Sequence, residues 1–506
     1  MKQTMWLRIL SVLIVIAMLA TAFAACEGES NQTDKDDNGT NEQNSAHESL
    51  SGGETAGEVV TAEPTPEISK TNYDADFYLS VMNDSNPMRY FWVEESTGGA
   101  LSEAVYTRQQ KILDYLGVSI KAKSAGTYDE YTTGFKTAVK NKDGSVDTLV
   151  TPVYKGIPGL ILEQYLQDFQ DIPGIDLEQD YWNHDFMDAL SIADNYYLGF
   201  SDYNILYSYI IAFNKKMLGQ LVLDGYSEEE LYQSVYNGTW TLDRFLELGQ
   251  LGFQEKGDKD IFGLTGQQWV PWCGFFHSSN INLIEMDESG KYSIAIMNDA
   301  NKEKTANLVD KLKNFSASGY AKLTSGVDLP EEKLINNRAL MQLAATNWLE
   351  DYTNYDVSFG VLPYPLYDTD QYDPNSDSLG YRSLQWGGHL AVPAYLKNSQ
   401  MTGETLELLA FYSRPVQITF YEKVLGKQVA EAPNDAKMLD IVWNGVCSDI
   451  GQTLRDEADV LYFLPTVTMP DSNKQLSSYY ESIASAGNKK INNFIKKVEK
   501  ISSKNN

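Results

Sequence analysis

The sequence predicts an α/β protein with at least two lobes, on three observations. The chain has 506 residues, and a single hydrophobic core stops growing at roughly 250 to 300 residues. Apolar residues make up 42% of the chain, which is enough to fill more than one core. From about residue 73, short runs rich in β-branched and aromatic residues alternate with segments of helical periodicity. That alternation is typical of βαβ units and a mostly parallel sheet.

The first half of this pattern predicts three strands separated by helices. Residues 76–82 form the first strand, and apolar side chains then recur at helical spacing over 101–116. Gly117 follows as a helix stop. The next predicted elements are a strand at 118–124, a helix over 128–140 and a buried strand at 146–153.

The second half predicts a further strand and a series of helices. An apolar, aromatic run predicts a strand over 203–213, Ser227 and Glu230 have capping-box spacing, and Thr241 starts another helix. A strand at 261–266, a hairpin over 286–296, a helix over 302–315 and an amphipathic C-terminal helix with Ile491, Phe494, Ile495, Val498 and Ile501 on one face complete the pattern. We expect this last helix to pack on the body, with membrane-surface binding as the alternative.

Residues 1–26 have the pattern of a bacterial lipoprotein signal peptide. Basic residues precede an apolar run over about 9–23, which is shorter than the roughly 20 residues that a bilayer span needs. Ala24 and Ala25 then precede Cys26. This ending resembles a lipobox, in which the cysteine carries the lipid and becomes the mature N-terminus. A short permanent membrane helix is the alternative.

Residues 27–70 are predicted to be a disordered acidic tether. The stretch has no aromatic residue and is rich in Glu, Asp, Asn, Ser, Thr and Gly. Such a composition cannot bury enough apolar surface to offset the chain entropy lost on folding. A lipid on Cys26 would thus hold a folded part, beginning near residue 71, outside the membrane.

The charge of the chain argues against nucleic acid as a partner. Seventy acidic residues face 40 basic ones, for a net charge of −30. Phosphate backbones and anionic lipid surfaces repel such a protein. The sequence predicts a neutral or cationic ligand.

Cysteine usage excludes a disulfide-stapled scaffold and a paired CxxC zinc site, because only three cysteines occur. With Cys26 assigned to the lipid, Cys273 and Cys447 remain. We predict two buried thiols in preference to a disulfide.

Common catalytic signatures are absent. The sequence contains no GxxxxGK[ST], GxGxxG, GxSxG or HExxH motif. The histidines, at 47, 184, 277 and 389, are scattered singly, and the acidic pairs lack a calcium-loop pattern. We therefore predict no enzyme activity, no cofactor and no metal site.

Aromatic residues make up 12% of the chain, and they are the part of the composition that says most about a ligand. Tyr and Trp rings stack on the C–H faces of sugars while polar groups bind the hydroxyls. Trp269, Trp272, Phe275 and Phe276 lie in a segment, 267–280, that fits neither a helix face nor a strand face. It is predicted to be a ligand-binding loop.

Six segments, in this order behind a lipobox, resemble the extracellular solute-binding proteins of ABC importers. The resemblance is to family 1, the carbohydrate-binding lipoproteins of Gram-positive type, which are similar to maltose-binding proteins. The segments are AVYTRQQ (104–110), AFNKKML (212–218), LYQSVYNGTWTLDRFLEL (231–248), FGVLPYP (359–365), GGHLAVPAYLKN (387–398) and KMLDIVW (437–443).

The resemblance implies the two-lobed, type II fold of periplasmic binding proteins, with hinge strands between the lobes. It puts the hinge crossings near 203–207, 342–346 and 391–394. One lobe would combine 71–205 with 344–392, and the other would combine 206–343 with 393–506. By position, the cleft would receive Asn83, Trp92, Tyr154, Asp202, Trp269, Trp272, Trp348 and Trp386.

The implied function is capture of a sugar or another small polar solute and its delivery to the permease subunits of an ABC transporter. The protein would act at the outer face of the cell membrane, anchored by its lipid. Two alternatives stay open at this point. One is a secreted glycoside hydrolase that uses two of the many carboxylates. The other is a ligand-sensing subunit on the same scaffold.

Overall fold

The computed structural model describes residues 66–82, 88–127, 130–154, 156–326, 328–385, 387–429 and 433–505. The predicted signal segment, Cys26 and nearly all of the predicted tether lie outside these residues. Pro64–Asn506 forms one compact unit. Among the described residues, no helix combines the length and apolarity needed to cross a membrane.

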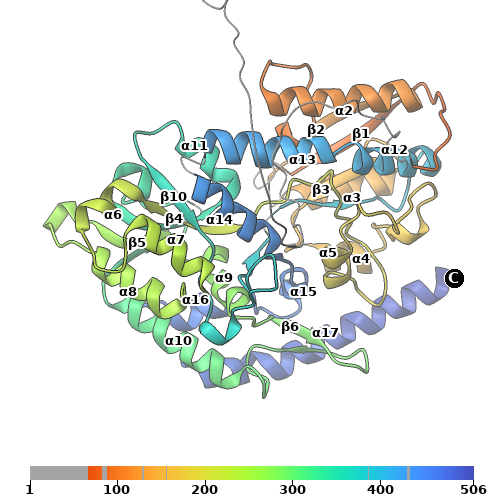
Figure 1. Cartoon of the computed structure of the whole chain (residues 1–506). Helices are drawn as coiled ribbons and strands as arrows, with labels where there is room; N and C mark the ends of the chain where they lie inside the picture. The colour runs from red at the N-terminus through yellow and green to blue at the C-terminus, as the bar shows by residue number, and fades with distance from the viewer. Residues whose placement is uncertain are drawn as a thin grey trace, which may run out of the picture. The chain divides into compact units, whose positions relative to one another are not determined.

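The first of two large sheets contains strands β1 (Ala75–Val81), β2 (Val118–Ser124), β3 (Thr148–Thr151) and β12 (His389–Ala391), in the order β12-β3-β1-β2 (Figure 1). Strand β1 runs parallel to β2 and β3, whereas β12 is antiparallel to β3. The three strands predicted between residues 76 and 153 are thereby confirmed, the third of them shorter than expected.

The second large sheet has the order β10-β4-β9-β5-β8. Its parallel pairs are β5 with β8 and β5 with β9, while β4 is antiparallel to both β9 and β10. The strands are β4 (Tyr209–Asn214), β5 (Phe262–Gln267), β8 (Ala321–Thr324), β9 (Ala339–Ala345) and β10 (Phe359–Leu362). The predicted strand at 203–213 is therefore wrong in its first part, because 203–208 connects the two sheets.

Helices surround these sheets. Helix α2 ends as predicted at Gly117, whose φ of 63° is a left-handed conformation that glycine adopts without a steric penalty. The helices are α2 (Ala100–Leu116), α3 (Tyr131–Asn141), α4 (Ile157–Leu162), α5 (His184–Ala189), α6 (Lys215–Leu221), α7 (Glu228–Tyr236), α8 (Leu242–Gly252), α9 (Val270–Ser278), α10 (Lys302–Ala317), α11 (Leu349–Tyr352), α12 (Ser399–Phe411), α13 (Arg414–Ile418), the π-helical η7 (Thr419–Val429), α14 (Pro433–Asn444), α15 (Ile450–Thr453), α16 (Phe463–Thr468) and α17 (Leu476–Asn505).

The predicted capping box at the start of α7 is present. The side chain of Ser227 accepts a hydrogen bond from the backbone N–H of Glu230, and the side chain of Glu230 accepts one from the backbone N–H of Ser227. Thr241 stands at the start of α8, as predicted, but its side chain makes no capping hydrogen bond.

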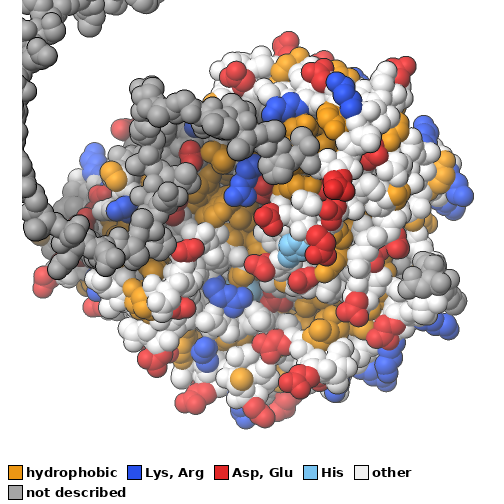
Figure 2. All heavy atoms as spheres, turned by 45° about the vertical axis from the view of Figure 1, so that its right-hand side comes forward, with side chains coloured by type: hydrophobic (Ala, Val, Ile, Leu, Met, Phe, Trp, Pro, Cys, Tyr) orange, Lys and Arg blue, Asp and Glu red, His pale blue; other side chains and the backbone are white. Residues whose placement is uncertain are grey.

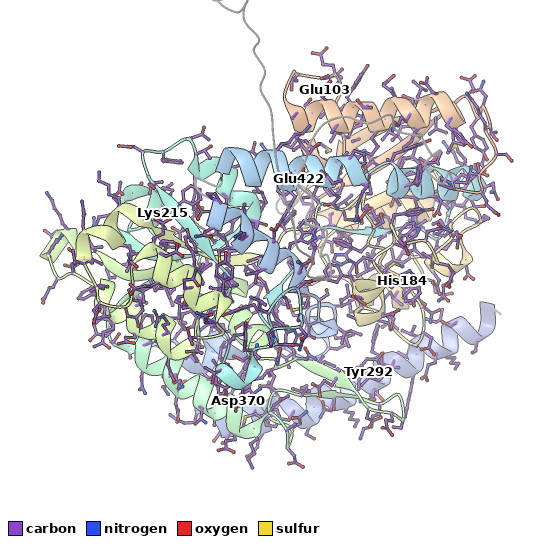
Figure 3. The ribbon with its side chains drawn as sticks, viewed as in Figure 1. Glu103, His184, Lys215, Tyr292, Asp370 and Glu422 are labelled. Atoms are coloured by element: carbon purple, nitrogen blue, oxygen red, sulfur yellow. The ribbon has the colours of Figure 1, made fainter. Side chains whose placement is uncertain are left out.

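The predicted hairpin and C-terminal helix are confirmed, and they pack together. Strands β6 (Ile284–Met286) and β7 (Tyr292–Ile294) are antiparallel. Tyr292, labelled in Figure 3, accepts a hydrogen bond at its carbonyl from Asn492 of α17 at 2.7 Å. The other end of α17 contacts α4, and Ser502 of α17 donates a hydrogen bond to Asn195 Oδ1, in the turn 192–195, at 3.0 Å. Four residues of the predicted apolar face are buried: Ile491, Phe494, Ile495 and Val498.

The predicted loop at 267–280 is wrong, since Val270–Ser278 forms helix α9. All nine of its residues are buried. A helix that is enclosed on every side has no polar face, so its sequence carries no helical periodicity. Cys273 lies in α9, and both it and Cys447 are free thiols, as predicted, but only Cys273 is fully buried.

Two segments do not follow the predicted division of the chain between the lobes. Strand β10 pairs with β4 in the second sheet, although 344–392 was assigned to the first lobe. The segment that contains α12, α13 and η7 packs on α2 of the first lobe, although 393–506 was assigned to the second. Glu407 of α12 is buried, and its carboxylate accepts a hydrogen bond from the indole of Trp182 at 2.9 Å. This contact helps to hold α12 against the first lobe.

Acidic side chains are spread over the face of the molecule that Figure 2 draws. Figure 2 shows Asp and Glu scattered over the visible face among Lys and Arg side chains. On this face the negative charge is therefore a property of the solvated surface rather than of one site.

Candidate functional site

The carboxyl ends of β1 and β3 lie at one edge of the first sheet, because the two strands are parallel. Tyr154 follows β3 at this edge, and its side chain is 7% exposed. His389 begins the antiparallel strand β12 at the same edge, opposite Thr151. Ligands of α/β proteins bind outside such edges.

The second sheet gathers aromatic residues at its corresponding edge. Trp269 follows β5, and Trp348 follows the parallel neighbour β9. Because β4 is antiparallel to β9, its first residue, Tyr209, lies at this edge too. Strand β10 is antiparallel to β4 and leads into Tyr364 there.

The two edges meet at a group of tyrosines. Burial raises the pKa of Tyr209 well above its usual range, and the neighbouring hydroxyls of Tyr154 and Tyr364 add to the effect. Burial likewise raises the pKa of Tyr207, with further contributions from Tyr90 and Tyr154. Tyr154 of the first lobe therefore lies close to two tyrosines at the start of the second, and the raised pKa keeps the hydroxyls of Tyr207 and Tyr209 protonated at neutral pH.

The connections between the sheets are hydrogen-bonded to one another. Ser208 pairs with Gln385, and its carbonyl accepts a hydrogen bond from the N–H of Thr346 at 3.0 Å. The N–H of Gln385 donates to the carbonyl of Cys447 at 2.9 Å. Segments far apart in sequence thus form one crossing region.

One predicted crossing agrees with the structure, and two do not. The chain passes between the sheets at 203–208, as expected near 203–207. It does not cross at 342–346, because 342–345 belong to β9, and β9 and the next strand, β10, share the second sheet. Nor does it cross at 391–394, since β12 is followed by α12 of the same lobe; the crossing precedes β12.

Trp269 lies at the edge of the second sheet with part of its ring exposed. Its indole N–H donates to the carbonyl of Ser325, which follows β8. Its ring contacts that of Tyr462, and the guanidinium of Arg455 lies 4.6 Å from the centroid of the Tyr462 ring. Trp348 is also half-buried and packs against both of the large hydrophobic clusters of the molecule.

Trp272 does not lie at this edge, and its assignment to the cleft is wrong. Its side chain is 0% exposed. The indole N–H donates to Thr468 Oγ1 at 2.9 Å, and the ring packs edge to face on Phe275. Trp272 is therefore a core residue that anchors α9 on α16.

Trp92 is not brought to the crossing region, whereas Asp202 directly precedes the crossing segment 203–208. The indole of Trp92 donates to the carbonyl of Ile120 at 3.0 Å. Ile120 belongs to β2, at the edge of the sheet opposite to β12. Asp202 forms an ion pair with Arg414 of α13 at 3.4 Å. Asn83 and Trp386 lie outside the described residues.

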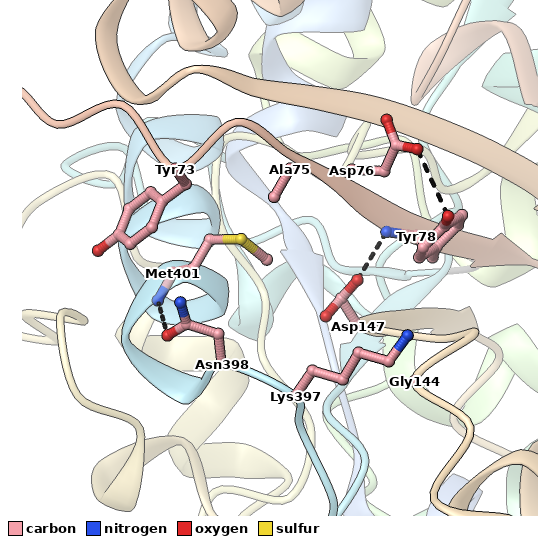
Figure 4. A pocket seen from close by; sticks show the side chains of 9 residues that line it. All are labelled: Tyr73, Ala75, Asp76, Tyr78, Gly144, Asp147, Lys397, Asn398 and Met401. Carbon is pink, nitrogen blue, oxygen red and sulfur yellow. Dashed lines mark hydrogen bonds between the residues drawn. The ribbon is translucent and has the colours of Figure 1, made fainter.

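A pocket of about 270 Å³ lies at the other end of the first sheet (Figure 4). Asp147 and Lys397 line it beside Tyr78 of β1. The carboxylate of Asp147 accepts hydrogen bonds from the N–H of Tyr78 at 2.7 Å and from Thr402 at 3.2 Å, so its buried charge is compensated internally. This pocket is at the amino end of β3 and does not belong to the tyrosine-lined edge.

Sequence reasoning missed the tyrosines of the crossing region. Tyr203, Tyr207 and Tyr209 fall in a segment that was interpreted as a plain strand, and Tyr364 and Tyr462 were not singled out. The sequence feature that could have pointed to these residues was the total of 32 tyrosines in the chain, which exceeds the number of any other aromatic residue.

Comparison with known proteins is in line with this geometry. Residues 109–426 match the family described as bacterial extracellular solute-binding protein. No curated protein matches the sequence.

Solved structures share the fold at low sequence identity. A cyclic α-maltosyl-1,6-maltose-binding protein from Arthrobacter globiformis is 12% identical with a TM-score of 0.56, over 83% of this chain and 99% of that one. The GacH receptor of Streptomyces glaucescens is 14% identical with a TM-score of 0.51, over 86% and 99%. UgpB from Mycobacterium tuberculosis, in complex with glycerophosphocholine, is 15% identical with a TM-score of 0.52, over 85% and 98%.

The fold is therefore the two-lobed, type II fold of periplasmic binding proteins. With its family match over more than half of the sequence, the chain belongs to the bacterial extracellular solute-binding proteins.

Proposed function

We propose that this protein captures a carbohydrate or a similar small polar solute between its lobes and delivers it to the permease subunits of an ABC importer. The observation that carries the proposal is the meeting of the two sheet edges at Tyr154, Tyr207 and Tyr209. Aromatic rings with polar hydroxyls suit a ligand that has both apolar faces and hydroxyl groups.

Capture follows from the two-lobed architecture. Solute binds at the edge of one lobe, and the lobes then close around it at the crossing region. Only contacts that differ between the open and closed states can drive closure. Trp269 and Tyr462 supply such contacts from the second lobe, and Tyr154 supplies them from the first.

The proposal includes an anchor at the outer face of the cell membrane. Cys26 would carry the lipid, and 27–70 would act as the tether. Such an arrangement would keep the binding protein near its permease.

Thermal unfolding of the purified protein with named solutes tests the function. The solute panel contains maltotriose, acarbose, mannotriose, tagatose and glycerophosphocholine. A ligand present at 100 times its Kd stabilises the native state by about 2.7 kcal/mol, which raises the Tm measurably. A Tm that is unchanged with every panel member would contradict the proposal. Release of new reducing ends from the oligosaccharides would favour a hydrolase instead.

A further inference from the structure

Several buried polar atoms on Gln385 and in the segment 448–453, which follows β13, have no hydrogen-bond partner. Within the described part of the chain, the side-chain amides of Gln385 and Gln452 make no hydrogen bond through either their oxygen or their nitrogen. The hydroxyls of Ser448 and Thr453 have no partner either. Gln385 and Gln452 are each 0% exposed. Buried polar groups are nearly always satisfied in native proteins, so a cluster of exceptions needs an explanation.

These groups are connected through the backbone. The short strands β11 (Ser383–Leu384) and β13 (Val446–Cys447) pair in parallel. The N–H of Gln385 continues this pairing by donating to Cys447, which directly precedes Ser448. Gln385 also pairs with Ser208 where the chain crosses between the sheets.

The side chain of Gln385 occupies space that Gly387 leaves open. A Cβ atom on Gly387 would lie 2.5 Å from the Nε2 atom of Gln385 and 3.3 Å from the carbonyl oxygen of Ile205. Any larger residue at 387 would displace this amide. The glycine thus keeps the amide in the crossing region.

Asp449 holds the segment 448–453 in place. Its Oδ1 atom accepts from the N–H of Gly451 at 2.6 Å, and its Oδ2 atom accepts from the N–H of Leu283 at 2.6 Å. Oδ2 also lies 2.9 Å from His277 Nε2, and both side chains are almost fully buried. The only carboxylate of the segment is therefore occupied by internal contacts.

We propose that Gln385 and the segment 448–453 form a subsite that binds the hydroxyl groups of a neutral, polyhydroxylated solute. Amides and hydroxyls both donate and accept hydrogen bonds, as the hydroxyls of a sugar do. The unpartnered atoms carry no charge, and Asp449 has no free oxygen for a cation. The subsite rests on the proposed function, and it narrows the solute from any small polar compound to a neutral one.

Replacement of the amides by leucine separates a ligand role from a structural role. Gln385→Leu and Gln452→Leu remove the polar atoms while keeping a similar side-chain volume. Because the amides have no partner to lose, the Tm of each variant should equal or exceed that of the unsubstituted protein. The Kd for a sugar that binds the unsubstituted protein, measured by calorimetry with maltotriose, acarbose, mannotriose and tagatose, should rise at least 10-fold.

Gln342 is the matched control. It is equally buried, in β9, but its amide accepts a hydrogen bond from the N–H of Leu334 at 3.0 Å and donates one to Tyr352. Gln342→Leu should therefore lower the Tm and leave the Kd unchanged in the protein that remains folded.

The outcomes distinguish this subsite from the proposed function. If the unsubstituted protein binds a sugar and both leucine variants bind it equally well, the subsite is wrong and the function stands. The subsite is also wrong if both variants lose Tm as Gln342→Leu does, or if glycerophosphocholine binds and no sugar does. If no panel member binds the unsubstituted protein, both proposals fall.

Discussion

The rings of Trp269 and Tyr462 meet edge to face, with their centroids 4.9 Å apart. Trp269 comes from the end of β5, and Tyr462 directly precedes α16, so the contact joins two parts of the second lobe at the edge where we propose that the solute binds. Part of the Trp269 ring stays exposed. Tyr462 is more deeply buried, and this burial raises the pKa of its hydroxyl. The pair presents an aromatic surface that is held in position by β5 through Trp269 and by the start of α16 through Tyr462.

Trp269→Ala should weaken binding of the solute at least 10-fold, a loss of about 1.4 kcal/mol. The reason is the removal of a stacking surface that the folded protein does not need for its core. Calorimetry with a solute that binds the unsubstituted protein measures the change, and the Tm without solute should move little. An unchanged Kd would remove Trp269 from the binding site.

Trp272→Ala should have the opposite signature. This change empties a fully buried site and leaves Thr468 without its indole partner, so the free energy of unfolding should fall by about 3–5 kcal/mol. Denaturant unfolding followed by circular dichroism measures this loss. Equal stability of the variant and the unsubstituted protein would show that Trp272 is not part of the core.

His389 should make the protein sensitive to acid. Burial lowers the pKa of its imidazole to about 3, whereas an unfolded histidine titrates near about 6.5. The unfolded chain therefore takes up the proton first. The contribution of His389 is complete above about pH 6.5 and is lost as the pH falls towards about 3, with a decline of about 3 kcal/mol by pH 4.

His389→Leu should flatten this part of the stability profile. The expected result is a smaller loss of unfolding free energy between about pH 7 and pH 4, measured by denaturant titration at each pH. His184→Leu serves as the control, because His184 lies on the surface at the start of α5. Parallel profiles for His389→Leu and the unsubstituted protein would contradict the prediction.

Ser227→Ala should cost about 1 kcal/mol of stability, because it removes the side-chain oxygen that caps α7. Thr241→Ala is the matched comparison at the start of α8, where the side chain makes no capping hydrogen bond. The second substitution should cost less than the first in denaturant unfolding. The reverse order would show that capping does not decide the difference.

Cys26→Ala should release the protein from the membrane. Without a thiol at this position no lipid can be attached, so the protein should move from the membrane fraction to the medium or remain unprocessed. Fractionation of the producing bacteria with detection of the protein gives the result. Unchanged membrane association would rule out Cys26 as the anchor.

Local signals in the sequence were sufficient for strands β1 to β7, with β4 in part, and for helices α2, α3, α7, α8, α10 and α17, but not for the elements between α10 and α17. Gly117 marked the end of α2, and Ser227 with Glu230 marked the start of α7, because each depends on a few neighbouring residues. Helix α9 escaped detection for a physical reason: its complete burial removes the contrast between an apolar and a polar face.

Long-range pairing was less accessible. The residues of β10 do not predict that this strand pairs with β4. The periodicity of α12 likewise does not predict that this helix packs on α2. For the site, Trp269 and Trp272 are three residues apart and look alike in sequence. Only the start of α9 between them turns one ring to the sheet edge and the other into the core.

Helix α17 gives the molecule a mechanical link outside its hinge. Its contact through Asn492 with Tyr292 and its contact through Ser502 with Asn195 are ten residues apart, or about 15 Å along a rigid rod. A change in the angle between the lobes must either move Ser502 relative to Asn195 or rotate helix α17. A fluorophore on the last turn of α17 would therefore convert solute uptake into an optical signal, far from the site where the solute is held.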